Sequence, residues 1–387
     1  MPTILHINTT AGADTTVGRF ANNLRDAAIS AGWKAFVAAG FGRADIVMHT
    51  RIMHTVGALR HRITASDGQC FSRATKNLVR RIEALKPDIV HLHNLHGYYL
   101  NTHFLASYLQ KAQIPTVMTV HDCRLASGRC AVCLCEKWLS RDCLQCPHPE
   151  LYPAVWNFFA SRVPEYRMAR DLAQLNLHLV SPSWSLKNIL SRSELSHIPI
   201  SVIPNGIDTD IFNSIGHKKP EKTQLLAVAN TWHKTKNFDA LIRLAQCMPS
   251  EWQLTIIGNV TGKQRKDASR FHNILLVTKS VHPAELAKFY QNSSVTLSPS
   301  LSESFGLTLS ESVACGTPVL ANSEAFPQAY IPDSGGMYAP FSQPETIIRS
   351  IKRVADKPIM AAPSSLKEMA AAYLALYRQI LGGEVNN

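Results

Sequence analysis

Residues 295–323 read VTLSPSLSESFGLTLSESVACGTPVLANS, and this stretch indicates the fold class. Its ends, VTLSPS and PVLANS, are short apolar runs typical of buried strands, and GLTLSESVACG between them has the apolar spacing and glycine boundaries of a helix. Strand, helix and strand over so short a span predict two parallel strands joined by a crossover helix. Strand-like runs alternate with helical patterns throughout the chain. The sequence therefore predicts an α/β fold of doubly wound parallel sheets.

The length of the chain, 387 residues, indicates two domains. The first strand–helix series ends at ISVIPNGID, where Pro-Asn-Gly is a turn signal and the composition becomes polar. A second series opens at QLLAVAN. We therefore predict an N-terminal domain at 1–204, a second domain at 205–364 and a final helical segment at 365–387. Two such domains in succession leave a central cleft faced by the carboxyl ends of their strands, where ligands are expected.

The formal charge of +12 is concentrated in one region of the sequence. The basic region 43–86 holds nine Lys or Arg against three Asp or Glu, a net charge of +6. Arg73, Lys76 and Arg80 share one face of a predicted helix over 72–85, because residues three and four apart are neighbours on a helix. The N-terminal half is therefore expected to contact an anionic partner, either phospholipid headgroups, a phosphorylated acceptor or nucleic acid.

Composition and termini indicate a soluble, cytoplasmic protein. Hydrophobic residues make up 45% of the chain, enough for two cores. No apolar run approaches the roughly 20 residues of a bilayer span. The first residues, MPTILHINTT, lack the basic and apolar regions of a signal peptide.

Six of the nine cysteines fall in a Cys-rich insertion at 123–147. Cys130 and Cys133, followed by Cys143 and Cys146, have the spacing of a structural zinc site, and four thiolates leave no open position for catalysis. A reduced Cys-rich loop is the other interpretation. The pattern also raises a second class, a zinc-dependent nucleic-acid-binding protein. However, the basic residues are not interleaved with aromatic ones and the cysteines interrupt an α/β series, so we expect no nucleic acid.

Glu303 and Glu311 raise the question of function. Acids near a helix start are commonly only dipole partners. Here, however, Glu303 lies in a loop directly after an apolar strand, and Gly306 opens the helix with bare backbone N–H groups suited to an anion. Two carboxylates that accept hydrogen bonds from hydroxyls, on either side of an anion cradle, outline a nucleotide-sugar site.

At this point the sequence resembles a known family, the retaining glycosyltransferases of family four, which have the GT-B fold of two Rossmann-like domains. The spacing of seven residues between Glu303 and Glu311 is similar to the signature of that family. The Cys-rich stretch is similar to the branch of colanic-acid and other bacterial surface-polysaccharide transferases. Further matching stretches are VIPNGID, KNFDALIRLA and VHD.

The resemblance implies roles for residues of the second domain. Glu311 is expected to bind the nucleotide ribose and Glu303 to lie against the donor sugar. The backbone of Phe305, Gly306 and Leu307 is expected near the diphosphate, and Lys236 to neutralise the charge on the leaving group. Most members carry an arginine five residues before this lysine. Here that position is Thr231. Either His233, Lys234 or another base is expected to substitute for the arginine, or departure of the leaving group depends more heavily on Lys236.

The resemblance also implies roles elsewhere. His121 follows the predicted strand PTVMTV and is expected near the reaction centre of the sugar, where it orients hydroxyls. Gly12 matches the first glycine-containing loop, near donor phosphate and acceptor. Asn205 lies in the VIPNGID junction and is expected to contact the donor. The final helix is expected to cross back onto the N-terminal domain.

Together these points predict a retaining hexosyltransferase. The expected donor is a UDP- or GDP-sugar, and the expected acceptor is a lipid-linked (polyprenyl diphosphate) glycan of O-antigen, capsule or exopolysaccharide synthesis. Because protein cations and a helix N-terminus are expected to stabilise the diphosphate, we expect no catalytic metal. We expect peripheral attachment through the basic region to the inner face of the cytoplasmic membrane. A nucleotide-sugar epimerase of the same architecture is the alternative.

Overall fold

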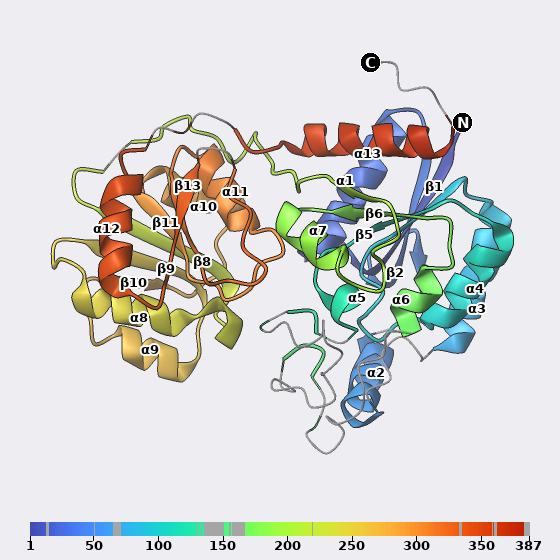
Figure 1. The fold of residues 1–387 in the computed structure, drawn as a ribbon, viewed down its shortest axis with the longest axis horizontal. Helices are drawn as coiled ribbons and strands as arrows, with labels where there is room; N and C mark the ends of the chain where they lie inside the picture. Colours follow the sequence, from blue (N-terminus) through green and yellow to red (C-terminus); the bar gives the residue numbers. More distant parts are fainter. Residues whose placement is uncertain are drawn as a thin grey trace. The chain divides into compact units, whose positions relative to one another are not determined.

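The computed structural model describes residues 1–382, apart from positions 13–14, 50, 65–70, 129, 133, 135–150, 155, 157–166, 219, 333–334, 358 and 360–361. It divides into two compact units. Unit 1 comprises Met1–Pro204 and Lys367–Asn387, and unit 2 comprises Asn205–Leu366. Each is described below by itself (Figure 1).

Unit 1 is built on a parallel sheet with the strand order β3-β2-β1-β4-β5-β6-β7. Every pairing between neighbouring strands is parallel, including His6 of β1 opposite His91 of β4. The strand order reverses between β1 and β4, which makes this the switch point of a doubly wound sheet. The strands are β1 (Thr3–Ala11), β2 (Lys34–Gly42), β3 (Ile46–Val47), β4 (Ile89–Leu92), β5 (Thr116–Thr119), β6 (Leu177–Ser181) and β7 (Ile200–Val202).

Helices cover both faces of this sheet (Figure 1). On one face α1 and α13 meet, with the rings of Phe20 and Tyr373 5.8 Å apart. Two buried hydrogen bonds join α13 to the sheet, from Tyr377 Oη to His91 Nδ1 (2.6 Å) and between the hydroxyls of Tyr373 and Thr119 (2.8 Å). The helices are α1 (Thr16–Ser30), α2 (Arg51–Thr64), α3 (Ser72–Leu85), α4 (Thr102–Ala112), α5 (Arg124–Ser127), α6 (Arg167–Leu172), α7 (Trp184–Leu190) and α13 (Leu366–Ile380).

Unit 2 repeats the same arrangement. Its strand order is β10-β9-β8-β11-β12-β13, again with parallel neighbours, and the switch point lies between β8 and β11. The strands are β8 (Gln224–Thr231), β9 (Gln253–Asn259), β10 (Ile274–Val277), β11 (Val295–Ser298), β12 (Val319–Asn322) and β13 (Gly336–Ala339). The helices are the 3-10 turn η3 (Lys234–Lys236), α8 (Phe238–Cys247), α9 (Gly262–Ala268), α10 (Pro283–Gln291), α11 (Leu307–Ala314) and α12 (Pro344–Val354).

The core of unit 2 lies mainly between the sheet and α8 and α12. Leu241 and Leu244 of α8 pack there with Ile347 and Ile351 of α12, and all four are fully buried. The side chains recur three or four positions apart, so each helix offers one apolar stripe to the sheet. On the other face α10 and α11 cover β8 (Figure 1).

Local sequence explains several boundaries, and some expectations fail. The helix predicted over 72–85 is confirmed, and it ends at Lys86 because Pro87 disfavours helical geometry before it. Residues 151–154 form no helix, and residues 157–166 lie outside the described part. Helix α2 was not predicted. Among the described residues, no helix is both long enough and apolar enough to cross a bilayer.

Candidate active site

The switch point of unit 2 joins two residues that lie 67 positions apart. The ammonium group of Lys236 forms an ion pair with Oε1 of Glu303, and Ser300 Oγ donates a hydrogen bond to the same oxygen (2.9 Å). Lys236 ends η3 after β8, and Glu303 lies in the loop after β11. The sequence predicted both residues for the site but not their contact. Glu303 therefore orients the lysine as well as offering an acceptor.

Backbone contacts fix these two loops against each other. Leu301 N donates to the carbonyl of Thr235 (2.8 Å), and Asn237 Nδ2 donates to the carbonyl of Pro299 (3.1 Å). Asn322, at the end of β12, donates from Nδ2 to the carbonyl of Ser300 (3.2 Å). Three neighbouring strands thus hold the loop that carries Glu303. A rigid loop keeps the ion pair in one geometry without help from a ligand.

The start of α11 offers unoccupied donor groups to the same edge of the sheet. Gly306 precedes the helix with a φ of +96°, a conformation that glycine adopts without strain. No side chain caps this end among the described residues. Before it, Phe305 stacks on Tyr330 at 5.0 Å, and Tyr330 N donates to the carbonyl of Phe305 (2.6 Å). Leu307 begins the helix. Leu309 N donates to the carbonyl of Gly306 (3.0 Å), so the N–H groups of Leu307 and Thr308 are the ones in the first turn that an anion can use.

Glu311 lies one turn into α11 and is held by α10. Tyr290 donates its hydroxyl to Oε2 of Glu311 (3.0 Å). Burial and the negative charge of Glu311 raise the pKa of Tyr290 well above its usual value, so the phenol remains a donor. Burial, followed by the same charge, raises the pKa of Cys315 to about 12. One carboxylate oxygen of Glu311 thus accepts a hydrogen bond from the protein itself. Glu311 is half-buried, and its position suits a polar group at the start of α11.

Thr231, His233 and Lys234 lie between β8 and Lys236. Thr231 is the last residue of β8 and is half-buried, while His233 and Lys234 are exposed on the following turn. His233 N donates to the carbonyl of Thr231 (3.0 Å). Both candidate bases are thus close in sequence to the position of the family arginine. The substitution of His233 or Lys234 for the family arginine stays a prediction.

In unit 1, His121 and Asp122 follow β5. Asp122 Oδ2 lies 2.7 Å from Nε2 of His96, and Arg124 N donates to Asp122 Oδ1 (2.9 Å). Burial alone would raise the pKa of Asp122, but the charge and hydrogen bond of His96, with the bond from Arg124, lower it below its usual value. Asp122 therefore stays ionised and holds His96. His121 is the residue of this segment that was predicted for the site.

Sequence reasoning missed the histidines that lie beside His121. His6 lies on β1, and His91 and His93 lie at the end of β4; all three are fully buried. Nε2 of His93 lies 3.2 Å from Nδ1 of His6, and Nδ1 of His93 lies 3.3 Å from Nε2 of His121. The spacing of two in His-Leu-His, on a strand, was the available signal, because such residues share a face.

The remaining predicted residues have different outcomes. Gly12 follows β1 with a φ of +117°, at the switch point of unit 1, and its neighbours 13 and 14 lie outside the described part. Asn205 opens unit 2, and its Oδ1 is buried with no partner among the described residues. Cys130 is half-buried, whereas Cys133, Cys143 and Cys146 lie outside the described residues. The zinc site therefore stays a prediction.

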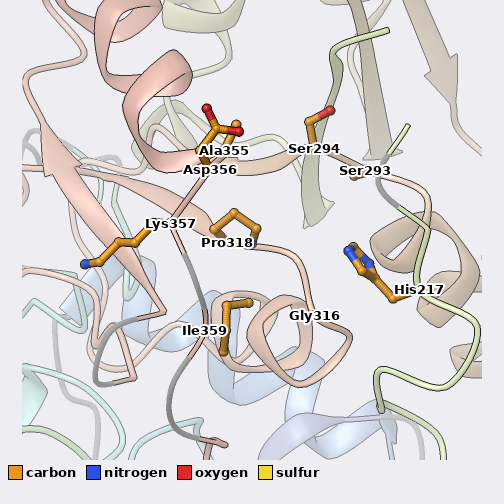
Figure 2. A pocket seen from close by; sticks show the side chains of 9 residues that line it. All are labelled: His217, Ser293, Ser294, Gly316, Pro318, Ala355, Asp356, Lys357 and Ile359. Atoms are coloured by element: carbon orange, nitrogen blue, oxygen red, sulfur yellow. The ribbon is translucent and has the colours of Figure 1, made fainter. Parts of the chain in front are cut away.

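A separate cavity of about 280 Å³ lies in unit 2 (Figure 2). It is lined by Ser293 and Ser294, which precede β11, and by Pro318, which precedes β12. His217 and Asp356 approach it from other segments, as Figure 2 shows. The cavity is therefore at the amino ends of the strands, whereas Lys236 and Glu303 lie at the carboxyl ends. It forms no part of the candidate site.

The two parallel sheets and the ion pair at one switch point define a class of protein, the GT-B glycosyltransferases. Family models agree. The model described as Glycosyltransferase Family 4 matches residues 12–211, and the model described as Glycosyl transferases group 1 matches residues 210–372. Because the first match covers more than half of the chain, the protein belongs to glycosyltransferase family 4.

Known proteins are similar to part of this chain. It is 33% identical over 145 residues to a D-inositol 3-phosphate glycosyltransferase of Nocardiopsis dassonvillei, covering 32% of this chain and 34% of that protein. It is 29% identical over 130 residues to the putative colanic acid biosynthesis glycosyl transferase WcaC of Escherichia coli, covering 32% of each. The chain thus spans about a third of the length of these relatives.

A solved structure of Anabaena Alr3699/HepE, in complex with UDP and glucose, has a similar fold. The TM-score is 0.58 at 13% identity, over 99% of this chain and 97% of that one. At this identity the likeness shows the fold alone. The predicted GT-B fold and the predicted membership of glycosyltransferase family 4 are confirmed.

Proposed function

We propose that this protein is a retaining hexosyltransferase that uses a UDP- or GDP-sugar and acts on a lipid-linked glycan in surface-polysaccharide synthesis. The observation that carries this proposal is the ion pair of Lys236 and Glu303 at the switch point beside the uncapped start of α11. The cation lies on η3, one carboxylate lies in the loop after β11, and the bare N–H groups and the second carboxylate lie on α11. Together they match the parts of a sugar nucleotide.

The donor is bound through unit 2. Glu311 accepts hydrogen bonds from the ribose diol, and the first turn of α11 holds the diphosphate. Glu303 accepts from the donor sugar. Lys236 stabilises the charge that develops on the leaving phosphate, and His233 or Lys234 adds to it in place of the family arginine. Because these groups supply the positive charge, we propose that catalysis uses no metal ion.

The transfer keeps the configuration at the anomeric carbon. The bond from that carbon to the phosphate oxygen breaks, and the bond to the acceptor oxygen forms on the same face. The proton of the acceptor hydroxyl moves to an oxygen of the departing diphosphate. Lys236 favours this step because it neutralises the leaving group as its charge grows. No nucleophile of the protein is required.

Unit 1 supplies the acceptor side and His121. Gly12 at the end of β1 gives close backbone approach to acceptor and phosphate, and Asn205 offers an unpartnered buried oxygen at the start of unit 2. Two relatives support the proposed donor and glycan class: the HepE structure contains UDP and glucose, and the name of WcaC refers to colanic acid biosynthesis.

A thermal-shift panel of UDP, GDP, CDP and dTDP tests the donor part of the proposal. We expect UDP or GDP to raise Tm by several degrees at a hundredfold excess over Kd, because selective binding to the folded state stabilises it by about 2.7 kcal/mol. Analysis of the sugar released or transferred then separates a transferase from an epimerase, which would return an altered nucleotide sugar without transfer. A folded protein that no nucleotide stabilises contradicts the proposal.

Helix α2 supports attachment to an anionic membrane. Ile52, Val56, Leu59 and Ile63 recur four, three and four residues apart, and their exposed fractions range from 37% to 75%. They form an apolar stripe on a helix that lies within the basic region 43–86 but was not predicted. The exposed basic residues Arg60, Arg62, Arg73, Lys76 and Arg80 lie on α2 and the next helix, α3. An apolar stripe with basic neighbours is typical of a helix that lies in a membrane interface.

Charge placed on this stripe is expected to reduce membrane binding. The double variant Val56→Asp, Leu59→Asp loses apolar area and adds two charges that anionic lipids repel, so binding should fall at least tenfold. Co-sedimentation with vesicles of phosphatidylglycerol and phosphatidylcholine measures it. Ile215→Asp, at an 82% exposed apolar residue of unit 2, is the matched control. Equal binding by both variants and the native protein contradicts the assignment of α2.

A further inference from the structure

Three histidine rings form a continuous row on one face of the sheet of unit 1. His6 lies on β1, His93 directly follows β4, and His121 follows β5. The distance from Nδ1 to Nε2 is 3.2 Å between His6 and His93, and 3.3 Å between His93 and His121. In each pair the rings are stacked with centroids 5.5 Å apart. The row runs from the core to the carboxyl edge of the sheet, where ligands bind in this type of fold.

The surroundings keep each ring neutral. Burial, together with the charge of Arg25, lowers the pKa of His6 to about 3. Burial lowers the pKa of His121 to about 4, although Asp122 opposes this. Burial and the neighbouring rings lower the pKa of His93 well below its usual value. Near neutral pH each ring therefore carries one proton, on either Nδ1 or Nε2.

Only two proton arrangements satisfy both contacts between the rings. In the outward arrangement, Nδ1–H of His6 donates to His93, and Nδ1–H of His93 donates to Nε2 of His121. The proton of His121 must then lie on its Nδ1. In the inward arrangement every donor is reversed, and the proton of His6 must lie on its Nε2.

The inward arrangement leaves a donor without an acceptor in the core. Nε2 of His6 is buried and has no hydrogen-bond partner among the described residues. Buried N–H groups without an acceptor are rarer in proteins than buried acceptors without a donor. The outward arrangement is therefore favoured, since it leaves a bare ring nitrogen at this place.

We propose that His6 and His93 are positioning residues that hold His121 as the tautomer with its proton on Nδ1, so that His121 donates a hydrogen bond to a hydroxyl of the sugar substrate. This inference rests on the proposed function for the identity of the substrate, but the tautomer itself does not. A ring nitrogen is set as donor or acceptor by the bond that the other nitrogen makes.

The position of His121 fits this role. It is the outermost and least buried ring of the row, and its Nδ1 has no hydrogen bond to the described part of the chain. Phe20 packs edge-on against His121, with centroids 5.0 Å apart, and limits rotation of the ring. A neutral N–H donor in a fixed direction distinguishes a hydroxyl, whose oxygen accepts the hydrogen bond, from a hydrogen at the same position.

A metal ion is the other use of this cluster. His6, His91 and His93 offer nitrogens within 4.8 Å of one another. However, both ring nitrogens of His91 already contact Thr119 (2.8 Å) and Tyr377 (2.6 Å), and both of His93 belong to the row. Metal binding would break these contacts.

Histidine nitrogen NMR on the full-length protein tests the tautomer directly. Protein labelled with ¹⁵N-histidine gives separate long-range correlations for protonated and bare ring nitrogens, and His121→Gln assigns the His121 signals. We expect protonated Nδ1 for His6, His93 and His121. His6→Phe removes the first donor, and His121 should then populate both tautomers. In His6→Asn the amide replaces the Nδ1 donor and should restore the native pattern.

His91→Phe is the matched control, because His91 is equally buried on the adjacent strand but lies outside the row. It should leave the His121 tautomer unchanged. A proton on Nε2 of His121 in the native protein overturns the proposal. An unchanged His121 tautomer in the His6→Phe variant also overturns it, provided that circular dichroism shows the variant to be folded. The proposal is likewise overturned if mass spectrometry finds one equivalent of zinc or iron in the native protein and none in the His6→Phe variant.

Steady-state kinetics separate this inference from the proposed function. With the donor that stabilises the native protein, His6→Phe should lower kcat about tenfold with KM within twofold, and His6→Asn should recover most of it. His91→Phe should keep the native kcat in its folded fraction. Loss in His91→Phe equal to that in His6→Phe indicates a structural role and contradicts the proposal. Absence of any transfer by native protein refutes the proposed function, while the NMR result still decides the tautomer.

Discussion

Glu311→Gln is expected to weaken binding of the stabilising nucleotide roughly 10- to 100-fold. The hydrogen bonds of a carboxylate to a ribose diol are charge-assisted and are worth about 1.5–3 kcal/mol, and a neutral amide keeps the shape but loses that strength. The amide also has only one acceptor atom, and Tyr290 already donates to one oxygen of Glu311. Isothermal titration of the variant with UDP or GDP measures the effect.

Tyr290→Phe is the control for this variant. It removes the hydrogen bond to Glu311 but leaves the carboxylate in α11, so nucleotide affinity should fall well under tenfold. If Tyr290→Phe weakens binding as much as Glu311→Gln, packing between α10 and α11 determines affinity. If both variants bind as the native protein does, the ribose contact is wrong.

Lys236→Ala is expected to lower kcat roughly 10²- to 10³-fold while Kd for the nucleotide changes less than about tenfold. A cation aimed at a leaving group stabilises charge that grows only in the transition state, and such groups contribute about 2.7–4 kcal/mol. Single-turnover transfer and titration of the same sample provide the two numbers. Equal losses in kcat and in affinity contradict the leaving-group role, because they indicate uniform binding.

Two further variants locate the origin of that effect. Lys279 forms a surface ion pair with Glu285 in unit 2 (3.2 Å), so Lys279→Ala removes a Lys–Glu pair of the same kind without touching the switch point. It should leave kcat unchanged. Glu303→Gln keeps Lys236 but removes its partner. A smaller loss than in Lys236→Ala indicates that Glu303 mainly orients the lysine.

The fold could be predicted because its signals are local. In the stretch 295–323, each strand or helix is recognisable from its own apolar spacing, and the parallel sheet follows from their alternation. Helix α2, which was not predicted, has helical apolar spacing too, but its apolar residues face outward, so the stripe does not mark the core. The sequence pattern shows which residues are apolar, but it does not show whether the protein core or a membrane covers them.

The site was only partly predictable, for a different reason. The spacing between Glu303 and Glu311 lies within one loop and one helix, and sequence reveals it. Contact between Lys236 and Glu303 depends on β8 being next to β11, which the strand order decides and no local pattern records. The row from His6 to His121 likewise crosses β1, β4 and β5, so it becomes visible only in the sheet.

Helix α13 has a consequence for the order of events during synthesis. Its tyrosines bond to His91 and Thr119 in the core of unit 1, yet residues 366–380 leave the ribosome after all of unit 2. Until α13 has been synthesised, the sheet of unit 1 therefore lacks the helix that packs on one of its faces. His91 and Thr119 then lack their hydrogen bonds to the two tyrosines. Unit 2 can fold before unit 1 is complete. A nascent chain halted before α13 would thus present an unfinished N-terminal unit, the kind of surface that chaperones recognise.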